Sequence, residues 1–205
     1  MNAINFIQQH GVDKARGVVE GAPDKTATHY VFRKIPSYYS IEFQSWYHDG
    51  EWWDSDCHTE QDLIDSYGSD FVLSLSDLKR LVESVDVVKQ LDFWGRADVG
   101  IKKAKEVIKN NTLQASYYQP SSGCYYRYGR NSLYIVRDGE WREIYVGMDS
   151  NTLIHTDSLK QAIADYEEIY KCTYCNGFGE VGCQFEGTFT CPDCNGDRYV
   201  GGEHV

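Results

Sequence analysis

The sequence lacks any apolar run that approaches the roughly 18 residues needed to cross a bilayer. Its first ten residues also lack the charged start and the apolar stretch of a secretion signal. Both absences predict a cytoplasmic protein without a membrane partner. With 205 residues, 41% of them hydrophobic, the chain is long enough to bury a core of its own.

Positive charge is scarce, because 20 Lys and Arg residues stand against 31 Asp and Glu residues and leave a formal net charge of −11. Proteins that bind phosphate backbones without sequence preference use Lys and Arg to displace counterions. We therefore expect no direct contact with nucleic acid.

Patterns typical of enzymes are missing as well. The sequence contains no phosphate-cradling loop, no Ser-centred elbow and no HExxH helix. Cys57 and His58 could be read as a nucleophile and its base, or as parts of a second metal site with His48, Asp54 and Asp56. Sequence neighbours rarely form a catalytic pair, and no orienting partner is identifiable. We predict that the protein is not an enzyme and has no catalytic residue.

Two cysteine knuckles lie near the end of the chain. Each is a CxxC followed by Asn-Gly, and fifteen residues separate the two. Two residues between cysteines let a tight turn aim both thiolates at one ion, and two such turns complete a tetrahedral site with metal–sulfur distances of about 2.3 Å. Two glycine-flanked pairs argue against a thioredoxin-like redox CxxC. We predict one structural zinc ion with four ligands: Cys172, Cys175, Cys191 and Cys194.

The unit CxxCxGxG resembles the repeating unit of the DnaJ-type chaperone zinc domain, over residues 172–198 alone. The resemblance implies that the two units pair to hold one zinc ion. Arg198 departs from the pattern by replacing the last glycine, and the His-Pro-Asp tripeptide of a J-domain does not occur. Cys183 lies between the knuckles, and we leave open whether it is a spare thiol or a substitute ligand.

The remaining chain consists of repeated pieces, which indicates an α+β protein that arose by duplication. A short helical element at 11–19 recurs at 100–108, and both copies faintly resemble the second half of a helix-hairpin-helix DNA-binding unit without its glycine turn. A β-rich piece with Asp-Gly-Glu-Trp follows each copy. We expect three parts, namely a helical and β-hairpin module with a second helix pair at 1–115, a hairpin/helix module at 116–170 and the DnaJ-like zinc finger at 171–205.

Each β-rich piece predicts a hairpin followed by a helix. Asp-Gly tolerates the positive φ angles of a tight hairpin turn and lies between aromatic and β-branched residues. Apolar residues then recur at helical spacing within 78–85 and 159–166. We expect Ser76-Asp77 and Thr156-Asp157 to precede these helices and to cap their first turns.

Segment 35–78 holds ten carboxylates and no Lys or Arg, and aromatic residues interleave with the acids. Exposed aromatic anchors among carboxylates suit a basic groove on another protein, and such a surface can also imitate the phosphates of DNA. The alternative is that the tryptophans are core and the acids a solvated face. Trp52 and Trp141 hold matching repeat positions, so we expect both to serve the fold. The candidate partner-binding residues are Trp46, Asp49, Glu51, Trp53, Asp54 and Asp56.

The repeated modules and the terminal finger together resemble accessory proteins carried by lambdoid bacteriophages and their prophages, on the opening at 1–23 and the helices at 78–85 and 159–170. The resemblance implies an origin in a bacterial host cell more than an activity. We expect a non-enzymatic protein that binds a basic surface of a host protein and inhibits a defence or nucleic-acid-handling enzyme. A chaperone-like or RNA-linked regulator acting through the finger is the alternative, and homo-oligomerisation stays open.

Overall fold

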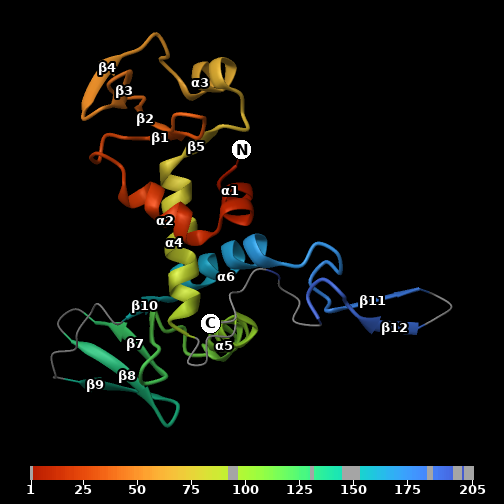
Figure 1. The fold of residues 1–205 in the computed structure, drawn as a ribbon. Coiled ribbons are helices and arrows are strands. Elements are labelled where there is room, and N and C mark those ends of the chain that lie inside the picture. The colour runs from red at the N-terminus through yellow and green to blue at the C-terminus, as the bar shows by residue number, and fades with distance from the viewer. Residues whose placement is uncertain are drawn as a thin grey trace. The chain divides into compact units, whose positions relative to one another are not determined.

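The computed structural model describes residues 2–91, 97–129, 132–144, 153–183, 187–195 and 200, and within these ranges the side chains of 97–100, 183 and 187 are not described. The chain forms two compact units, residues 1–83 and 84–205, and the division falls inside helix α4 (Leu75–Lys89). Figure 1 labels the elements. In the part of the chain that is described, no helix has both the length and the apolar character to cross a membrane.

Two short helices open the first unit, α1 (Ala3–His10) and α2 (Val12–Glu20). The Asn2 side chain caps α1 by accepting a hydrogen bond from the Asn5 N–H at 2.8 Å. Gly11 separates the two helices at a φ of 81°, which glycine adopts without steric strain. Apolar side chains at helical spacing give each helix one buried face, formed by Ala3, Phe6, Ile7, Val12, Ala15 and Val18.

A five-stranded antiparallel sheet follows in the first unit. Its strands are β1 (His29–Val31), β2 (Ser37–Ser40), β3 (Ser45–His48), β4 (Glu51–Asp54) and β5 (Val72–Ser74). Their spatial order is β4-β3-β2-β1-β5, so β4 and β5 form the two edges. Helix α3 (Glu60–Tyr67) separates β4 from β5 in the sequence, and α4 begins directly after β5.

One face of this sheet carries a row of aromatic side chains that crosses four strands. Residues directly opposite each other on paired strands share a face, and the register aligns Tyr30, Tyr38, Tyr47 and Trp52. The Tyr38 hydroxyl donates a hydrogen bond to the Val18 carbonyl of α2 at 2.8 Å. This row therefore faces α2.

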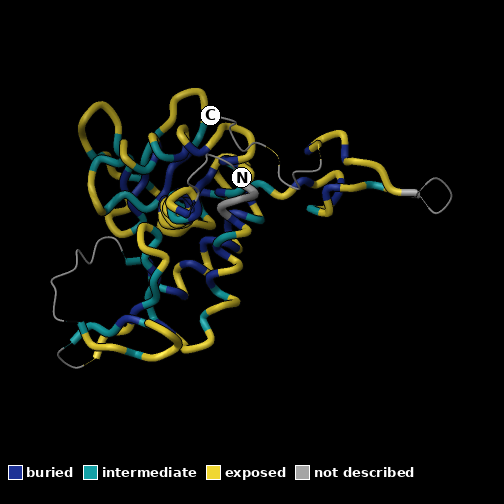
Figure 2. The backbone as a smooth tube through the Cα atoms, turned by 90° about the horizontal axis from the view of Figure 1, so that it is seen from below, coloured by how far each residue is buried: buried dark blue, intermediate teal, exposed yellow. Residues whose placement is uncertain are grey.

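The opposite face carries a second row, Tyr39, Trp46 and Trp53. Tyr39 is fully buried, its hydroxyl donates to the Cys57 carbonyl, and the Trp46 ring lies edge-on between the rings of Tyr39 and Tyr67. Tyr39, Trp46 and Tyr67 pack with aliphatic side chains from β1, β5 and α3 into one core, which includes Val31, Leu63 and Val72. The dark blue stretches in Figure 2 mark such buried segments.

The second unit repeats this arrangement. It contains α5 (Ala97–Asn110), β6 (Tyr117–Gln119), β7 (Cys124–Tyr128), β8 (Leu133–Arg137), β9 (Glu140–Ile144), β10 (Ile154–His155) and α6 (Thr156–Tyr170). The strand order is β9-β8-β7-β6-β10, which matches the first sheet element by element. A separate two-stranded hairpin, β11 (Glu180–Cys183) and β12 (Gly187–Thr190), follows α6. The mixed helix and sheet content confirms the α+β class.

Individual hydrogen bonds recur between the two sheets. The Tyr125 hydroxyl donates to the Val107 carbonyl of α5 at 2.7 Å, in the same way that Tyr38 donates to Val18. The N–H of the first α6 residue, Thr156, donates to the Ser116 carbonyl at 2.9 Å. The N–H of the first α4 residue donates to the Thr28 carbonyl at the same distance. The two β-modules therefore share their tertiary bonds as well as their strand order.

The Asp-Gly turns have the predicted conformation in both sheets. Asp49 and Gly50 have φ values of 52° and 89°, and Asp138 and Gly139 have values of 53° and 79°. Two successive positive φ angles define the two-residue turn whose twist suits a hairpin. The turns join β3 to β4 and β8 to β9.

The predicted helix caps are wrong by one or two positions. Helix α4 already begins at Leu75, and the Ser74 hydroxyl accepts a hydrogen bond from the Asp77 N–H at 3.3 Å. Helix α6 begins at Thr156 and is capped by His155, whose Nδ1 accepts from the Asp157 N–H at 3.2 Å. Each helix starts earlier than expected because its first residue is already anchored to a carbonyl directly before the neighbouring strand, Thr28 before β1 and Ser116 before β6.

Candidate functional site

The two cysteine knuckles have similar backbone turns. Asn176 and Asn195, which follow the second cysteine of each knuckle, have φ values of 52° and 47°. Asparagine tolerates this left-handed conformation better than most residues. In the first knuckle, the Gly177 N–H donates to the Cys172 carbonyl at 3.0 Å, which closes the turn. These turns bring the two cysteines of a knuckle to one side of the chain.

The hairpin β11–β12 brings the second knuckle back to the first. The Cys191 N–H donates to the Gly179 carbonyl at 2.9 Å, directly after the last strand pair. The four sulfur atoms consequently lie within 4.8 Å of one another, and all four cysteines are buried. Their Sγ–Sγ distances include 3.8 Å for Cys172–Cys191 and 3.6 Å for Cys175–Cys194.

These distances fit a tetrahedral metal site. A tetrahedron with metal–sulfur distances of about 2.3 Å has edges of about 3.8 Å. A disulfide would instead bring two sulfur atoms to about 2.05 Å. The predicted ligands Cys172, Cys175, Cys191 and Cys194 thus form one group able to hold a metal ion. Four protein donors fill a tetrahedral site, so such a site leaves no position for a catalytic water.

The surroundings of Cys175 favour its thiolate form. Burial raises the pKa of this thiol, but the Gly179 N–H, 3.2 Å from Sγ, and the neighbouring thiols lower it to about 6. Hydrogen-bond donors around a metal site commonly hold its ligands in the orientation that binding requires. The side chain of Cys183 lies outside the described residues, so its predicted role as spare thiol or substitute ligand stays a prediction.

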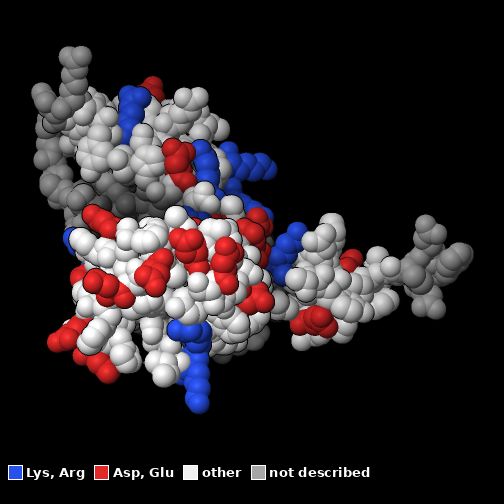
Figure 3. Space-filling model, turned by 90° about the horizontal axis from the view of Figure 1, so that it is seen from above, with Lys and Arg blue, Asp and Glu red and all other residues white. Residues whose placement is uncertain are grey.

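The predicted partner-binding carboxylates are all exposed. They lie on β4 or directly beside it, at Asp49, Glu51, Asp54 and Asp56. Figure 3 views the molecule from the side on which Figure 1 draws β3, β4 and α3, and it shows carboxylates spread over this part with few cations among them. The whole segment 35–78 supplies ten carboxylates and no Lys or Arg.

The two predicted aromatic anchors differ in their surroundings. Trp53 is 58% exposed on edge strand β4, and Phe43 in the β2–β3 connection is 57% exposed. Trp46 packs instead against the buried Tyr39, so it contributes to the core of the first sheet. Phe43 was not among the predicted anchors, although it lies in the same cation-free segment. A role for Trp46 in binding stays a prediction, and Trp53 is the exposed anchor.

The same fold exists in the second sheet without the acidic surface. The matching segment 122–159 contains four Arg and five acidic residues, against ten acidic residues and no cation in 35–78. Arg142 occupies the position of Trp53, one residue after the matching tryptophan. Trp141 itself is partly buried beneath the Arg127 guanidinium, 4.4 Å from the ring centre. The sheet architecture therefore does not require the charge of the first copy.

The residues weighed as a nucleophile and base do not come together. Cys57 is buried, with its Sγ 3.8 Å from the Ser66 hydroxyl. His58 is exposed, and its Nδ1 lies 2.7 Å from the Gln44 side-chain oxygen. Among the described residues, the only group of three or more potential ligands is the four-cysteine cluster, so His48, Asp54 and Asp56 form no second metal site there.

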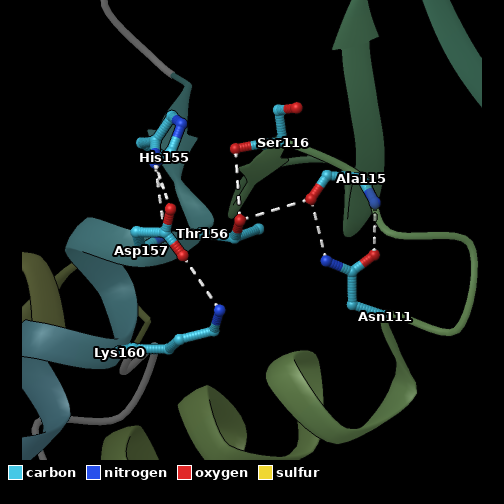
Figure 4. A network of polar contacts seen from close by, with 7 residues as sticks. All are labelled: Asn111, Ala115, Ser116, His155, Thr156, Asp157 and Lys160. Carbon is cyan, nitrogen blue, oxygen red and sulfur yellow. Dashed lines mark hydrogen bonds and ion pairs between the residues drawn. The ribbon is translucent and has the colours of Figure 1, made fainter.

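A polar hollow of about 370 Å³ lies at the start of α6 (Figure 4). Asn111 donates to and accepts from the backbone of Ala115, at 2.8 and 2.7 Å. Thr156 donates to the Ala115 carbonyl at 3.2 Å, and Lys160 pairs with Asp157 at 2.9 Å. These contacts join the end of α5, the start of β6 and the first turn of α6. Because the groups bond to one another, we assign the network to the fold.

Comparison of the chain with protein-family models, curated protein sequences and solved structures finds no match. The candidate functions therefore rest on the residues and geometry described above.

Proposed function

We propose that this chain is a non-enzymatic accessory protein of bacteriophage or prophage origin that binds a basic surface of a bacterial host protein. The acidic aromatic surface of the first sheet, defined as Trp53 with Asp49, Glu51, Asp54 and Asp56, makes the contact. The bound protein is then a defence or nucleic-acid-handling enzyme, and the carboxylates occupy the place of nucleic-acid phosphates.

The observation that supports this function is the charge contrast between two copies of one fold. Both copies keep the same strand order, Asp-Gly turns and tyrosine hydrogen bonds. Ten carboxylates without a cation appear in one copy, whereas the other is nearly balanced. Since packing does not demand the acidity, we attribute it to recognition. Carboxylates accelerate and select encounters with a basic partner, while an exposed tryptophan supplies contact area.

The four-cysteine group is proposed to hold one structural Zn²⁺. Cysteine thiolates are soft ligands, and a buried set of four with near-tetrahedral spacing is typical of structural zinc. The ion would order the knuckles and take no part in chemistry. The DnaJ-like pattern of residues 172–198 is consistent with this assignment.

Capture of partners from a bacterial lysate tests the acidic surface. The tagged chain is compared with two variants that each neutralise one sheet. The test variant is D49N/E51Q/D54N/D56N, and the matched control in the second sheet is D138N/E140Q/E143Q. Basic proteins should be retained at 0.1 M salt and released at 1 M, because the screening length falls from about 10 Å to about 3 Å. Only the test variant should lose them. Salt-resistant capture, or equal capture by the test variant and the parent chain, contradicts the proposal.

A second candidate function places binding on the finger, as a chaperone-like or RNA-linked regulator. Its support is three exposed aromatic side chains close to the cysteine cluster, Tyr174, Phe178 and Phe189, of which Phe178 is 73% exposed. Replacing these three by serine should abolish binding of unfolded polypeptide or RNA with the metal still bound. Unchanged binding by the serine variant removes this candidate.

A further inference from the structure

The outer edge of β4 is unpaired within the described residues. Strand β4 ends the spatial order of the first sheet and bonds only to β3. The two-residue turn at Asp49-Gly50 makes His48 and Glu51, which flank it, a hydrogen-bonded pair. Because bonded and non-bonded pairs alternate, Trp46 and Trp53 form the next bonded pair.

A hydrogen bond just beyond β4 supports this assignment of bonded and non-bonded pairs. The Ser55 N–H donates to the Gln44 carbonyl at 2.9 Å, two residues after Trp53. Trp52 and Asp54 therefore occupy the non-bonded positions, where N–H and C=O groups point away from the partner strand. No backbone hydrogen bond of Trp52 or Asp54 is found among the described residues. The outer edge of β4 therefore presents the backbone N–H and C=O groups of Trp52 and Asp54 to a further strand.

Carboxylates surround these free backbone groups. Glu51 lies on the same face of β4 as the exposed Trp53, and Asp54 lies on the other face. Asp49 and Asp56 stand at the two ends of the strand. An added strand would therefore meet negative charge on both faces and at both ends.

This charge decides what can add to the edge. A second copy of β4 would place the same carboxylates opposite one another, and like charges directly opposite destabilise a strand pair. Edge charges protect sheets from such self-association. An extended segment with Lys or Arg at alternate positions would instead form opposite-charge pairs across the junction. Strand β9 holds the same edge position in the second sheet but carries Arg142 between Glu140 and Glu143. Its mixed charge would not select a basic strand in the same way.

We infer that β4 receives an extended basic segment of the partner protein as an additional strand, with main-chain hydrogen bonds to Trp52 and Asp54. This inference rests on the proposed function, because it names how the partner binds the same acidic surface. Backbone bonds hold the segment in register, Trp53 covers it on one face, and the carboxylates select its charge.

A synthetic ten-residue peptide in which lysine alternates with threonine serves as the probe for the full-length chain. Two variants differ at one position, D54N and D54P. Both remove the same charge, but only D54P removes the outward N–H, and proline is tolerated at an edge position whose N–H is not used by the sheet. We expect a modest loss of peptide affinity for D54N and a further loss of at least tenfold for D54P.

Amide hydrogen exchange of the unmodified chain provides a measurement that does not depend on folding of the proline variant. Peptide binding should slow exchange at the Trp52 and Asp54 amides, while amides of β9 keep their rates. Equal affinities of D54N and D54P, or unprotected amides at saturating peptide, overturn strand addition and leave the acidic surface intact. If the fourfold neutralised variant binds the peptide as tightly as the parent chain, the proposed function itself fails.

Discussion

Loss of the metal should unfold the finger and leave both five-stranded sheets folded. Among the described residues of the finger, one partly buried apolar side chain, Val181, packs against the four cysteines. Burying a valine contributes at most about 3 kcal/mol. A structural zinc site supplies about 10–16 kcal/mol in isolated finger peptides. A bound zinc ion would therefore stabilise the finger more than the apolar burial seen in its described residues.

The perturbation is Cys175→Ser, with a strong chelator added to the unsubstituted chain as a second route to the same state. Zinc is counted per chain with a colorimetric indicator, and folding is followed by amide NMR signals. The unsubstituted chain should hold one equivalent. In C175S the signals of Gly179 and Cys191, whose backbone groups bond to each other, should collapse to unfolded positions. Signals of the sheets should not move.

Cys124→Ser is the matched control, because Cys124 is a free, partly buried cysteine outside the cluster. It should keep one zinc ion per chain and a folded finger. Native finger signals in the chelated chain would refute the reasoning, since they would show that the knuckles fold without metal. Loss of zinc in C124S would equally show that the ligand set is not the four-cysteine group.

Three further outcomes are expected. Tyr38→Phe and Tyr125→Phe should each cost about 1 kcal/mol in urea unfolding, because each leaves one carbonyl without its hydroxyl donor, and clearly unequal losses would speak against equivalent roles in the two sheets. Thr59→Ala should cost about 1 kcal/mol through loss of the α3 cap, measured in the same way, and an unchanged midpoint would contradict it. Hydrogen bonds from the N–H of His58 and from the hydroxyl and N–H of Thr59 hold the pKa of Asp62 below its usual value. The ionised Asp62 therefore stabilises the folded state fully above about pH 4, the pKa in the unfolded chain. This stabilisation is lost as pH falls through the lower pKa of the folded state. Asp62→Asn should remove that part of the acid dependence, and an identical pH profile would count against it.

The local features of this fold were readable from the sequence because they depend on few neighbouring residues. A two-residue hairpin turn demands positive φ angles, which Asp-Gly tolerates, and both turns have them. The turn of each CxxC knuckle depends on adjacent residues alone, and the four sulfur atoms lie close together as predicted. Apolar spacing at 78–85 and 159–166 identified α4 and α6, since a helix buries one face at that period.

The last strand of each sheet in chain order, β5 and β10, was not predicted. Strands β5 and β10 contain three and two residues, too few to show an alternating pattern. Each pairs with a strand that lies far away in sequence, β1 and β6 respectively, and such pairing is decided by tertiary packing. Helix α3 was also missed, although Thr59 and Asp62 form a capping box at its start. Its eight residues bury mainly Leu63, so its hydrophobic period is weak.

The candidate binding residues could be chosen by composition but not by exposure. Trp46 and Trp53 lie directly opposite each other and share a face of the first sheet. Strand order decides how exposed each one is, since Trp46 is on an inner strand beside Tyr39 and Trp53 is on the edge strand. A sequence without its partner strands does not reveal which strand ends a sheet.

The contrast between these two tryptophans gives the first unit a built-in optical reporter. Trp46, held edge-on between two tyrosine rings, should contribute to the near-ultraviolet circular dichroism, because asymmetry of the ring environment creates that signal. Trp53, which is mostly in water, should emit fluorescence at longer wavelengths. A ligand covering β4 should therefore shift the emission to the blue and leave the dichroism unchanged, whereas unfolding would alter both.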